Sequence, residues 1–273
     1  MSQLFLVGMG PGDSELVSPK AVQAIEQSSD LVAYGLYLDL LGDLRENKTH
    51  HDLPLGEEIG RARKALELAA SGKTTALISS GDIGIYAMAT LVFELLDQQI
   101  NRDKDSTDSE DHPEWLDVEI EVIPGISAMQ AGAARAGALL GHDFCTVSLS
   151  DLLTPWETIE KRIHSAGAGD FVVSFYNPVS KKRDWQLNTA RDILLGYRPE
   201  NTPVLIGRQL TREDEQISFI KLKDLDAKDV DMFTLVMVGN SESRHIEYQS
   251  KRQNKDLKTQ QWLYTPRGYS KKL

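Results

Sequence analysis

A glycine-rich loop near the start of the chain is its clearest chemical signal. The loop reads Gly-Met-Gly-Pro-Gly-Asp, residues 8–13, and follows an apolar run at 4–7 that predicts a buried strand. The next helix is predicted to begin only at Ser18, as N-cap, with Pro19 in its first position. The glycines therefore form an extended loop, unlike the tight strand-to-helix turn that binds a dinucleotide. Because Pro11 lacks the backbone N–H that a phosphate cradle would use, we expect a ligand other than a pyrophosphate.

Four more loops rich in glycine, proline or small polar residues follow predicted strands. They are Ser79-Ser80-Gly81-Asp82-Ile83-Gly84, Pro124-Gly125-Ile126-Ser127-Ala128, Tyr176-Asn177-Pro178 and Val238-Gly239-Asn240. One such loop is weak evidence, because glycine and proline occur in most loops. Ligands of open α/β sheets usually bind at the carboxyl ends of strands. Four loops at such ends favour a shared ligand cleft between two domains.

Strand-like and helix-like patterns alternate along the elements that must position these loops. In the first half, strands are predicted at 30–33, 74–79 and 119–123, and helices at 57–71, closed by Gly72, and at 85–99. In the second half the predictions are a helix near 127–140, a strand at 144–149, a helix from 155, a strand at 171–176, a helix near 185–195, and strands near 204–207, 216–221 and 233–238.

This alternation predicts an α/β fold with two sheets. The first half has the spacing of a mostly parallel sheet covered by helices, and the closer spacing of the last strands predicts some antiparallel pairing. We place the domain junction near Pro124. The predicted organisation is an N-terminal α/β domain at 1–124, a C-terminal α/β domain at 125–245 and a basic tail at 246–273.

The composition is that of a soluble globular protein, with 41% hydrophobic and 26% charged residues. The net charge of −11 argues against nucleic acid as a partner, because a phosphate backbone needs a positive surface. No apolar stretch is long enough to span a bilayer, and the first residues lack the features of a signal peptide, so we expect a cytoplasmic protein. Cys145 is the single cysteine, which excludes an internal disulfide, a thiolate zinc site and a cysteine-ligated iron–sulfur cluster. We expect no bound metal.

The charges are unevenly distributed along the chain. Residues 101–117 carry seven acidic and two basic side chains and show no apolar periodicity, which predicts a solvated acidic insertion. From Arg244 to Leu273 there are eight basic and two acidic residues. This basic tail is either a solvated surface segment or a contact for an anionic ligand or a partner subunit.

Three of the motifs, taken in order, resemble the tetrapyrrole methylase family. They are Gly8-Met9-Gly10-Pro11-Gly12-Asp13, Ser80-Gly81-Asp82 and Val122-Ile123-Pro124-Gly125-Ile126-Ser127-Ala128. The resemblance implies the two-domain tetrapyrrole methylase fold, with a mostly parallel N-terminal sheet, a mixed C-terminal sheet and the active site in the cleft between them. It also implies S-adenosylmethionine as the methyl donor. Further segments resemble the subgroup that acts on carbon 17 of precorrin-3B in cobalamin biosynthesis; the most specific is Ser148-Leu149-Ser150-Asp151-Leu152-Leu153-Thr154-Pro155-Trp156.

The resemblance implies methylation of precorrin-3B at carbon 17, with contraction of the ring to give precorrin-4. In-line transfer of a methyl group from sulfonium to carbon depends on holding donor and acceptor at about 3–3.5 Å. Family members commonly form homodimers, to which the apolar helix at 85–96 is a candidate contributor. Two alternatives stay open. One is another tetrapyrrole methylase, acting on the cobalt-containing cobalt-factor III or at a different ring carbon, and the other is a non-catalytic nucleotide-binding module.

The resemblance also implies roles for individual residues. The positions that contact the methyl donor in related enzymes correspond here to Pro11, Ser80, Gly81, Asp82, Ile85, Ser127, Ala128, Asn177 and Leu210. Taken alone, Asp82 reads as a turn residue that bonds its own backbone. Ile83 stands where many relatives have proline, so we expect a slightly different loop path there.

Six residues are candidates for the tetrapyrrole side of the site. Asp13, His142 and Asp151 are the catalytic candidates, and Tyr34, Asp143 and Trp156 the substrate-binding ones. Each has a structural alternative: Trp156 as a core residue, His142 as a loop residue satisfied locally, and Asp151 as a helix cap. Because precorrins carry many carboxylates, some arginines must face them, and Arg208, Arg212 and Arg267 are possible.

Overall fold

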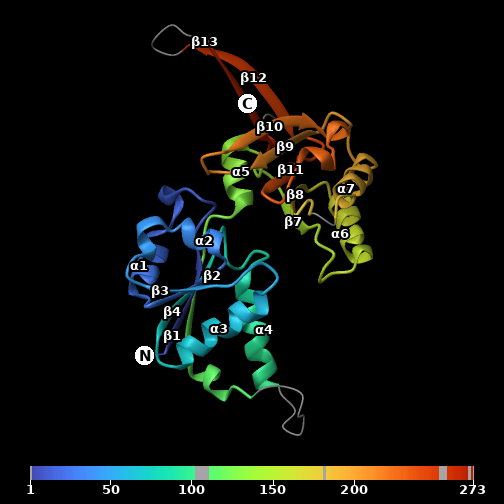
Figure 1. Ribbon diagram of the computed structural model, residues 1–273. Helices are drawn as coiled ribbons and strands as arrows, with labels where there is room; N and C mark the ends of the chain where they lie inside the picture. Colours follow the sequence, from blue (N-terminus) through green and yellow to red (C-terminus); the bar gives the residue numbers. More distant parts are fainter. Residues whose placement is uncertain (1, 102–110, 181–182, 252–256, 270–271, 273) are drawn as a thin grey trace. The chain divides into compact units, whose positions relative to one another are not determined.

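The chain divides into two compact units, each described here by itself. Unit 1 spans Met1–Ser127 and unit 2 spans Ala128–Leu273. The computed structural model describes residues 2–101, 111–180, 183–251, 257–269 and 272 (Figure 1). Most of the predicted acidic insertion, residues 102–110, lies outside the described residues, as do residues 252–256, 270–271 and 273 of the basic tail.

Unit 1 contains a parallel sheet of five strands in the order β3-β2-β4-β1-β5. The strands are β1 (Gln3–Gly8), β2 (Asp30–Ala33), β3 (Thr49–Asp52), β4 (Thr74–Ser79) and β5 (Glu119–Ile123). All neighbouring strands run in the same direction. Their carboxyl ends therefore lie along one edge of the sheet.

Helices cover both faces of this sheet. They are α1 (Pro19–Gln27), α2 (Gly35–Asp39), α3 (Glu58–Ala70) and α4 (Met88–Ile100), with short 3-10 helices at Ser14–Leu16, Gly42–Arg45 and Pro113–Asp117. Alternate residues of β1 point to opposite faces. Leu4 and Leu6 pack with α3 and α4, whereas Phe5 and Val7 pack with α1 and α2. A strand buried on both faces reads as a continuous apolar run, which is why β1 was predictable.

Two predictions for unit 1 are wrong in detail. The helix expected at 85–99 begins three residues later, at Met88, because Tyr86 has φ +52° and Ala87 is extended. The sequence also gave no sign of β3, whose Thr-His-His-Asp sequence is polar because the strand lies at the sheet edge. Ser18 caps α1 through its hydroxyl, and Gly72 follows α3 with φ +89°, both as predicted.

Unit 2 contains a mixed sheet of five strands in the order β10-β9-β11-β8-β7. The strands are β7 (Phe144–Ser148), β8 (Val172–Tyr176), β9 (Pro203–Arg208), β10 (Gln216–Lys221) and β11 (Thr234–Val238). β7 and β8 are parallel, and β11 lies antiparallel between β8 and β9. The carboxyl ends of β7, β8 and β9 therefore lie in one row, at the same end of their strands. The mixed second sheet is confirmed.

The antiparallel direction of β11 corrects one prediction. The loop Val238-Gly239-Asn240 was expected beside the other strand-end loops, but it follows β11 and so lies at the opposite edge of the sheet. Asn240 is buried and its side-chain oxygen accepts hydrogen bonds from Glu242 and Ser243. This loop is a local turn.

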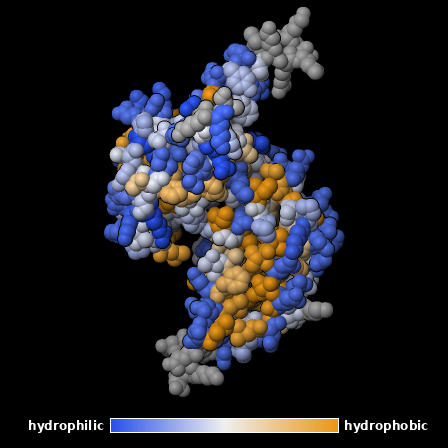
Figure 2. Space-filling view, turned by 180° about the vertical axis from the view of Figure 1, so that it is seen from behind, coloured by the Kyte–Doolittle hydropathy of each residue, from blue (hydrophilic) through white to orange (hydrophobic). Residues whose placement is uncertain are grey.

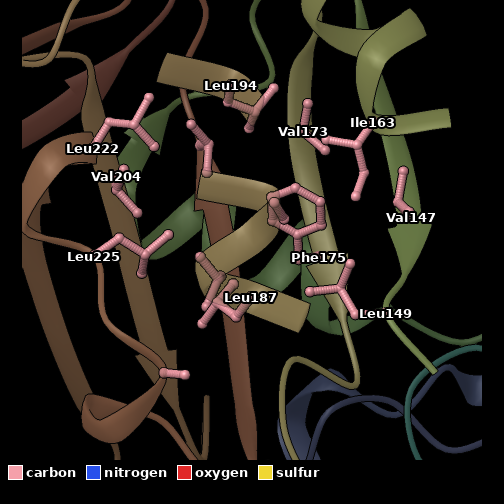
Figure 3. Close-up of a cluster of buried hydrophobic side chains, with 14 of the residues drawn as sticks. Val147, Leu149, Ile163, Val173, Phe175, Leu187, Leu194, Val204, Leu222 and Leu225 are labelled. Carbon is pink, nitrogen blue, oxygen red and sulfur yellow. The ribbon is translucent and has the colours of Figure 1, made fainter. Parts of the chain in front are cut away.

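The core of unit 2 lies between the sheet and helices α6 (Trp156–Ala168) and α7 (Gln186–Leu195). Figure 3 shows Phe175 and Val173 of β8 meeting Ile163 of α6 and Leu187 of α7. Phe175 is completely buried. Short 3-10 helices at Leu222–Asp224 and Ala227–Asp229 border this core.

Unit 2 also has a hairpin that the sequence did not predict. β12 (Arg244–Lys251) pairs with β13 (Leu257–Tyr264), and β13 pairs with the short strand β6 (Gly137–Ala138). The hairpin includes much of the segment expected to be a basic tail (Figure 1). β6 also ends helix α5 (Ala128–Ala136) earlier than the predicted residue 140, because Gly137 has φ +125° and leaves the helix.

Candidate active site

Three strand-end loops of unit 1 meet in direct main-chain contact. Gly10 donates its N–H to the carbonyl of Gly81 at 3.1 Å, and Gly81 donates to the carbonyl of Gly10 at 2.7 Å. A Cβ atom on Gly8 would lie 2.7 Å from the Gly125 nitrogen and 2.8 Å from the Gly81 oxygen. A Cβ on Gly125 would overlap the Gly81 oxygen. The ends of β4, β1 and β5 therefore approach so closely that a side chain at Gly8 or Gly125 cannot fit.

The carboxylate of Asp82 joins two of these loops. Its Oδ1 accepts the N–H of Gly84 at 2.8 Å, and its Oδ2 accepts the N–H of Gly125 at 3.0 Å. The turn role considered from the sequence is therefore present, extended by a bond to the loop after β5. Each oxygen retains a lone pair that can accept another hydrogen bond. Ile83, completely buried against α4, anchors the same loop.

The other predicted residues of unit 1 lie on or near this edge. Pro11 is buried in the first loop, and Ser80 directs its hydroxyl toward the Gly10 carbonyl at 3.5 Å. Asp13 caps the 3-10 helix Ser14–Leu16 by accepting the N–H of Glu15. Ile85 donates its N–H to the Asp82 carbonyl.

Two further candidates of unit 1 flank these loops. Tyr34 follows β2 and meets the ring of Tyr37 edge-on, with 5.6 Å between the ring centroids. Ser127 is buried, and the next residue, Ala128, begins α5 of unit 2.

In unit 2, side chains tie together the ends of β7 and β8. Asn177 donates its Nδ2 to the Ser148 hydroxyl at 3.0 Å, and Ser150 donates its N–H to the same hydroxyl at 3.3 Å. Arg183 donates Nη1 to the Ser150 hydroxyl at 2.9 Å and Nη2 to the Asn177 carbonyl at 3.1 Å. The four residues form a closed ring of hydrogen bonds, which we call the serine–arginine ring.

Asp151 lies beside this ring and does not cap a helix. Its Oδ2 accepts a hydrogen bond from Gln186 Nε2 at 3.0 Å, and its Oδ1 lies 3.9 Å from Arg183 Nη1. Burial lowers the pKa of Arg183 below its ordinary value, and the nearby Asp151 carboxylate opposes that change. The helix that follows has Pro155 at its N-cap, without a side-chain cap. Asp151 is thus available to a ligand on its solvent side, since a third of its side chain is exposed.

The loop after β9 holds Leu210 in strained main chain. Gln209 and Thr211, on either side of it, have φ +47° and +66°, a region that is unfavourable for a β-branched residue such as Thr. The N–H of Thr211 donates to Glu215, whose carboxylate also accepts Arg135 Nε at 2.9 Å. Strain held in place by such contacts is typical of functional loops.

A model of the family described as Tetrapyrrole (Corrin/Porphyrin) Methylases matches residues 3–226. The chain belongs to the tetrapyrrole methylase family.

Individual relatives narrow the comparison for this tetrapyrrole methylase. It is 39% identical to a precorrin-3B C(17)-methyltransferase from Sinorhizobium sp, over 98% of this chain and 97% of that protein. It is 41% identical to a cobalt-factor III methyltransferase from Priestia megaterium, over 99% of this chain but 46% of that protein, so it spans about half the length of that relative. The crystal structure of the methyltransferase CobJ superposes with a TM-score of 0.82 at 38% identity, covering 97% of this chain and 99% of that one. The predicted fold is confirmed.

Two candidates of this methylase lie away from the serine–arginine ring. His142 and Asp143 precede β7, whereas Asp151 follows it, and the five residues of β7 span about 16 Å. The His142 imidazole accepts the N–H of Asp143 at 2.8 Å, the local arrangement considered from the sequence. Together with Phe144 and Arg267 they border a hollow of about 270 Å³. His142 and Asp151 therefore lie at opposite ends of the same strand, β7.

Other candidates of unit 2 have mainly structural surroundings. Trp156 packs against the core and meets the ring of Trp185 edge-on, with 4.7 Å between centroids. Leu210 is buried, and its side chain fills the space beside Gly207. Arg208 pairs with Asp231 at 2.6 Å. Burial raises the pKa of the Cys145 thiol, opposed by Arg198, so thiolate chemistry is disfavoured there.

Arg183 and Gln186 are the residues that sequence reasoning missed in this methylase. Both are buried, yet both direct polar atoms to the loop after β7. Neither belongs to a motif quoted from the sequence, and no local pattern marks either one. Within the described ranges, no three histidine, cysteine or acidic residues are placed to hold a metal ion, and no helix is long and apolar enough to cross a membrane.

Proposed function

We propose that this methylase transfers a methyl group from S-adenosylmethionine to carbon 17 of precorrin-3B, with ring contraction to precorrin-4. The observation that carries the proposal is the meeting of the β1, β4 and β5 loops in bare main chain, on the motifs that resemble the donor site of the family. The name of the Sinorhizobium relative supports the acceptor and the ring carbon.

The residues at these loops fit a methyl donor. Gly10 and Gly81 both have positive φ and present main-chain groups without side chains, so a ligand can approach the backbone closely. We assign donor binding to Pro11, Ser80, Gly81, Asp82, Ile85, Ser127, Ala128, Asn177 and Leu210. S-adenosylmethionine supplies a methyl group activated on a positively charged sulfur. In our proposal the nine residues bind and orient that group and exclude water from it.

The remaining chemistry is assigned to side chains with a fixed carboxylate or an aromatic ring. Methyl transfer itself needs alignment more than a strong base. Ring contraction requires proton movements, and Asp151 is our first candidate for them because Gln186 holds its carboxylate while a third of the side chain stays exposed. Asp13 is a further candidate for proton movement, and Tyr34 and Trp156 for binding the macrocycle. His142 and Asp143 precede β7, at the other end of that strand from Asp151, and we do not assign them to the same site.

The cobalt-containing acceptor is the second candidate. It is favoured by the Priestia relative, which is named for cobalt-factor III and is about as similar to this chain as the Sinorhizobium protein. Cobalt-factor III carries cobalt and precorrin-3B carries no metal, so assays with each acceptor separate the two candidates.

The decisive experiment has two stages. First, calorimetric titration with S-adenosylmethionine should give saturable binding, and titration with NAD should give none; the reverse result would support a nucleotide-binding module. Second, precorrin-3B and cobalt-factor III are each incubated with the protein and donor, and the products are analysed by mass and absorption spectra. Addition of one methyl group without ring contraction would contradict the C17 assignment.

We further propose that the protein is a cytoplasmic homodimer. Support comes from the apolar area on unit 1 seen in Figure 2 and from exposed apolar side chains there, including Phe93 and Ile100 of α4 and Leu116. Sedimentation analysis should give a dimer, and Phe93→Lys should shift it toward a monomer. A monomeric wild-type protein at micromolar concentration would contradict the proposal.

A further inference from the structure

Arg183 has a buried guanidinium that donates hydrogen bonds to residues of two loops, those after β7 and β8. Arg183 is 7% exposed and follows β8 in the chain. The N–H of Ser180 donates to the Arg183 carbonyl. The side chain reaches back to Ser150 and Asn177, which follow different strands. One planar group with several donors can fix two segments at once.

The contact with Asn177 supports an unfavourable main-chain conformation. Asn177 has φ +51°, in the left-handed region that residues with a Cβ adopt only rarely. Arg183 Nη2 holds its carbonyl, and the Ser148 hydroxyl holds its side chain. Without the guanidinium, the carbonyl loses its partner and the loop is free to relax.

The contact with Asp151 fixes a carboxylate beside the same loop. Arg183 Nη1 lies 3.9 Å from Asp151 Oδ1, and Gln186 Nε2 donates to Oδ2. Gln186 is itself 1% exposed. The carboxylate therefore has the positive charge of Arg183 near one oxygen and a hydrogen bond from the buried Gln186 on the other.

A second buried arginine of unit 2 shows what a purely structural role looks like. Arg198 is 4% exposed and donates to the main-chain carbonyls of Gly239, Ala166 and Phe171, away from the edge at which Asn177 lies. Arg183 instead donates to Ser150 and to the Asn177 carbonyl, at the ends of β7 and β8, and its charge lies near Asp151. This difference indicates that the buried side chain of Arg183 holds the loops after β7 and β8 in place.

We propose that Arg183 is a positioning residue for both halves of the reaction, holding Asn177 for the methyl donor and Asp151 for proton transfer. This inference rests on the proposed function. It goes beyond that function in making donor affinity and turnover depend on a single side chain that touches neither the donor nor the acceptor.

The test compares Arg183→Met and Arg183→Lys with the control Arg191→Met. Arg191 lies on α7 in the same unit and donates to the Leu225 carbonyl, outside the site. Arg183→Met should weaken S-adenosylmethionine binding about 10-fold and lower kcat about 100-fold, with the KM for the tetrapyrrole changed less than threefold. Arg183→Lys should recover donor affinity to within about threefold but leave kcat low, because one ammonium cannot hold both loops. Arg191→Met should leave all three constants unchanged.

Circular dichroism and thermal unfolding show whether each variant is folded. If Arg183→Met does not fold, Ser150→Ala replaces it, since it removes only the Nη1 acceptor; about a fivefold loss of kcat is then expected. Folded variants with wild-type donor affinity and kcat overturn the positioning role. If the wild-type protein binds no S-adenosylmethionine, the proposed function fails, and the role of Arg183 fails with it.

Discussion

The strand-end loops of unit 1 and those of unit 2 are held together by different kinds of contact. In unit 1, main chain contacts main chain, and the one carboxylate involved, Asp82, bonds only backbone N–H groups in that contact. In unit 2, side chains do the joining, through two serines, an asparagine, an arginine and a glutamine. A main-chain contact tolerates no added atom, whereas a side-chain network can lose one bond and keep the others. The two edges should therefore fail differently when they are changed.

The largest effect is expected from adding a single methyl group to unit 1. In Gly125→Ala the new Cβ would overlap the Gly81 oxygen and approach the Gly8 carbonyl, and both are backbone atoms that cannot rotate away. We expect a loss of about 3 kcal/mol in the free energy of unfolding, the upper part of the range for overpacking, and no measurable donor binding.

Urea unfolding and calorimetry measure these two losses. The matched control is Gly60→Ala in the first turn of α3, where a Cβ would lie 3.4 Å from its nearest neighbours. That change should be neutral or stabilise the protein by up to about 1 kcal/mol, because alanine favours helix over glycine. Equal behaviour of the two variants would show that the loops of unit 1 can move apart.

The next effect tests the one side chain in the unit 1 contact. Asp82→Ala removes both acceptors and leaves the Gly84 and Gly125 N–H groups unpaired, which should cost about 2–3 kcal/mol. Asp82→Asn keeps one oxygen and should cost about half as much. The control is Asp97→Asn at an exposed position of α4, which should cost less than about 0.5 kcal/mol. If alanine and asparagine at 82 are equally harmless, the carboxylate does not organise these loops.

A smaller effect is expected at Asn177, which has positive φ although it carries a side chain. The positive-φ positions in the main-chain contact of unit 1, Gly10 and Gly81, are glycines. Asn177→Ala loses the bond to Ser148 and strains the main chain, for a cost of about 2 kcal/mol. Asn177→Gly loses the bond but relieves the strain, so its cost should be about 1 kcal/mol or less. Thermal unfolding ranks the two variants. A glycine variant less stable than the alanine one would mean that the backbone conformation is not the constraint.

The same contrast explains how far the sequence predicted this protein. β1, β4 and the cap of α1 were predictable because their signals are local: buried apolar runs, and Ser18 followed by Pro19. β5 was predictable from its isoleucine and valine residues, although most of it is not buried. The glycine-rich loops of unit 1 were predicted from local motifs, whereas the contacts among Gly8, Gly81 and Gly125 were not. The polar strand β3 and the hairpin of β12 and β13 carry no such apolar pattern, because most of their residues are exposed.

The side-chain network of unit 2 was out of reach for a related reason. Arg183 and Gln186 bond residues 33 and 35 positions earlier in the chain. No periodicity links such positions, so only the folded sheet brings them together. Likewise, the direction of β11, which moved the loop at 238–240 to the far edge, depends on pairing that spacing does not encode.

The smallest predicted effect is the pH dependence of the Arg208–Asp231 ion pair in unit 2. Burial alone would raise the pKa of Asp231, but hydrogen bonds from Arg208, Thr234 and the Phe233 N–H, with the charge of Arg208, hold it below its ordinary value of 3.8. A carboxyl whose folded pKa is lowered stabilises the protein fully above its unfolded pKa and loses that contribution as pH falls through the folded value. Wild type should therefore be more stable than Asp231→Asn at pH 6, and the gap should close below about pH 3.8. Because the Arg208 pair is partly exposed, the gap should also shrink at high salt. Thermal unfolding at a series of pH values measures it, and a gap that stays constant down to pH 3 would show that this ion pair does not hold the β9 loop.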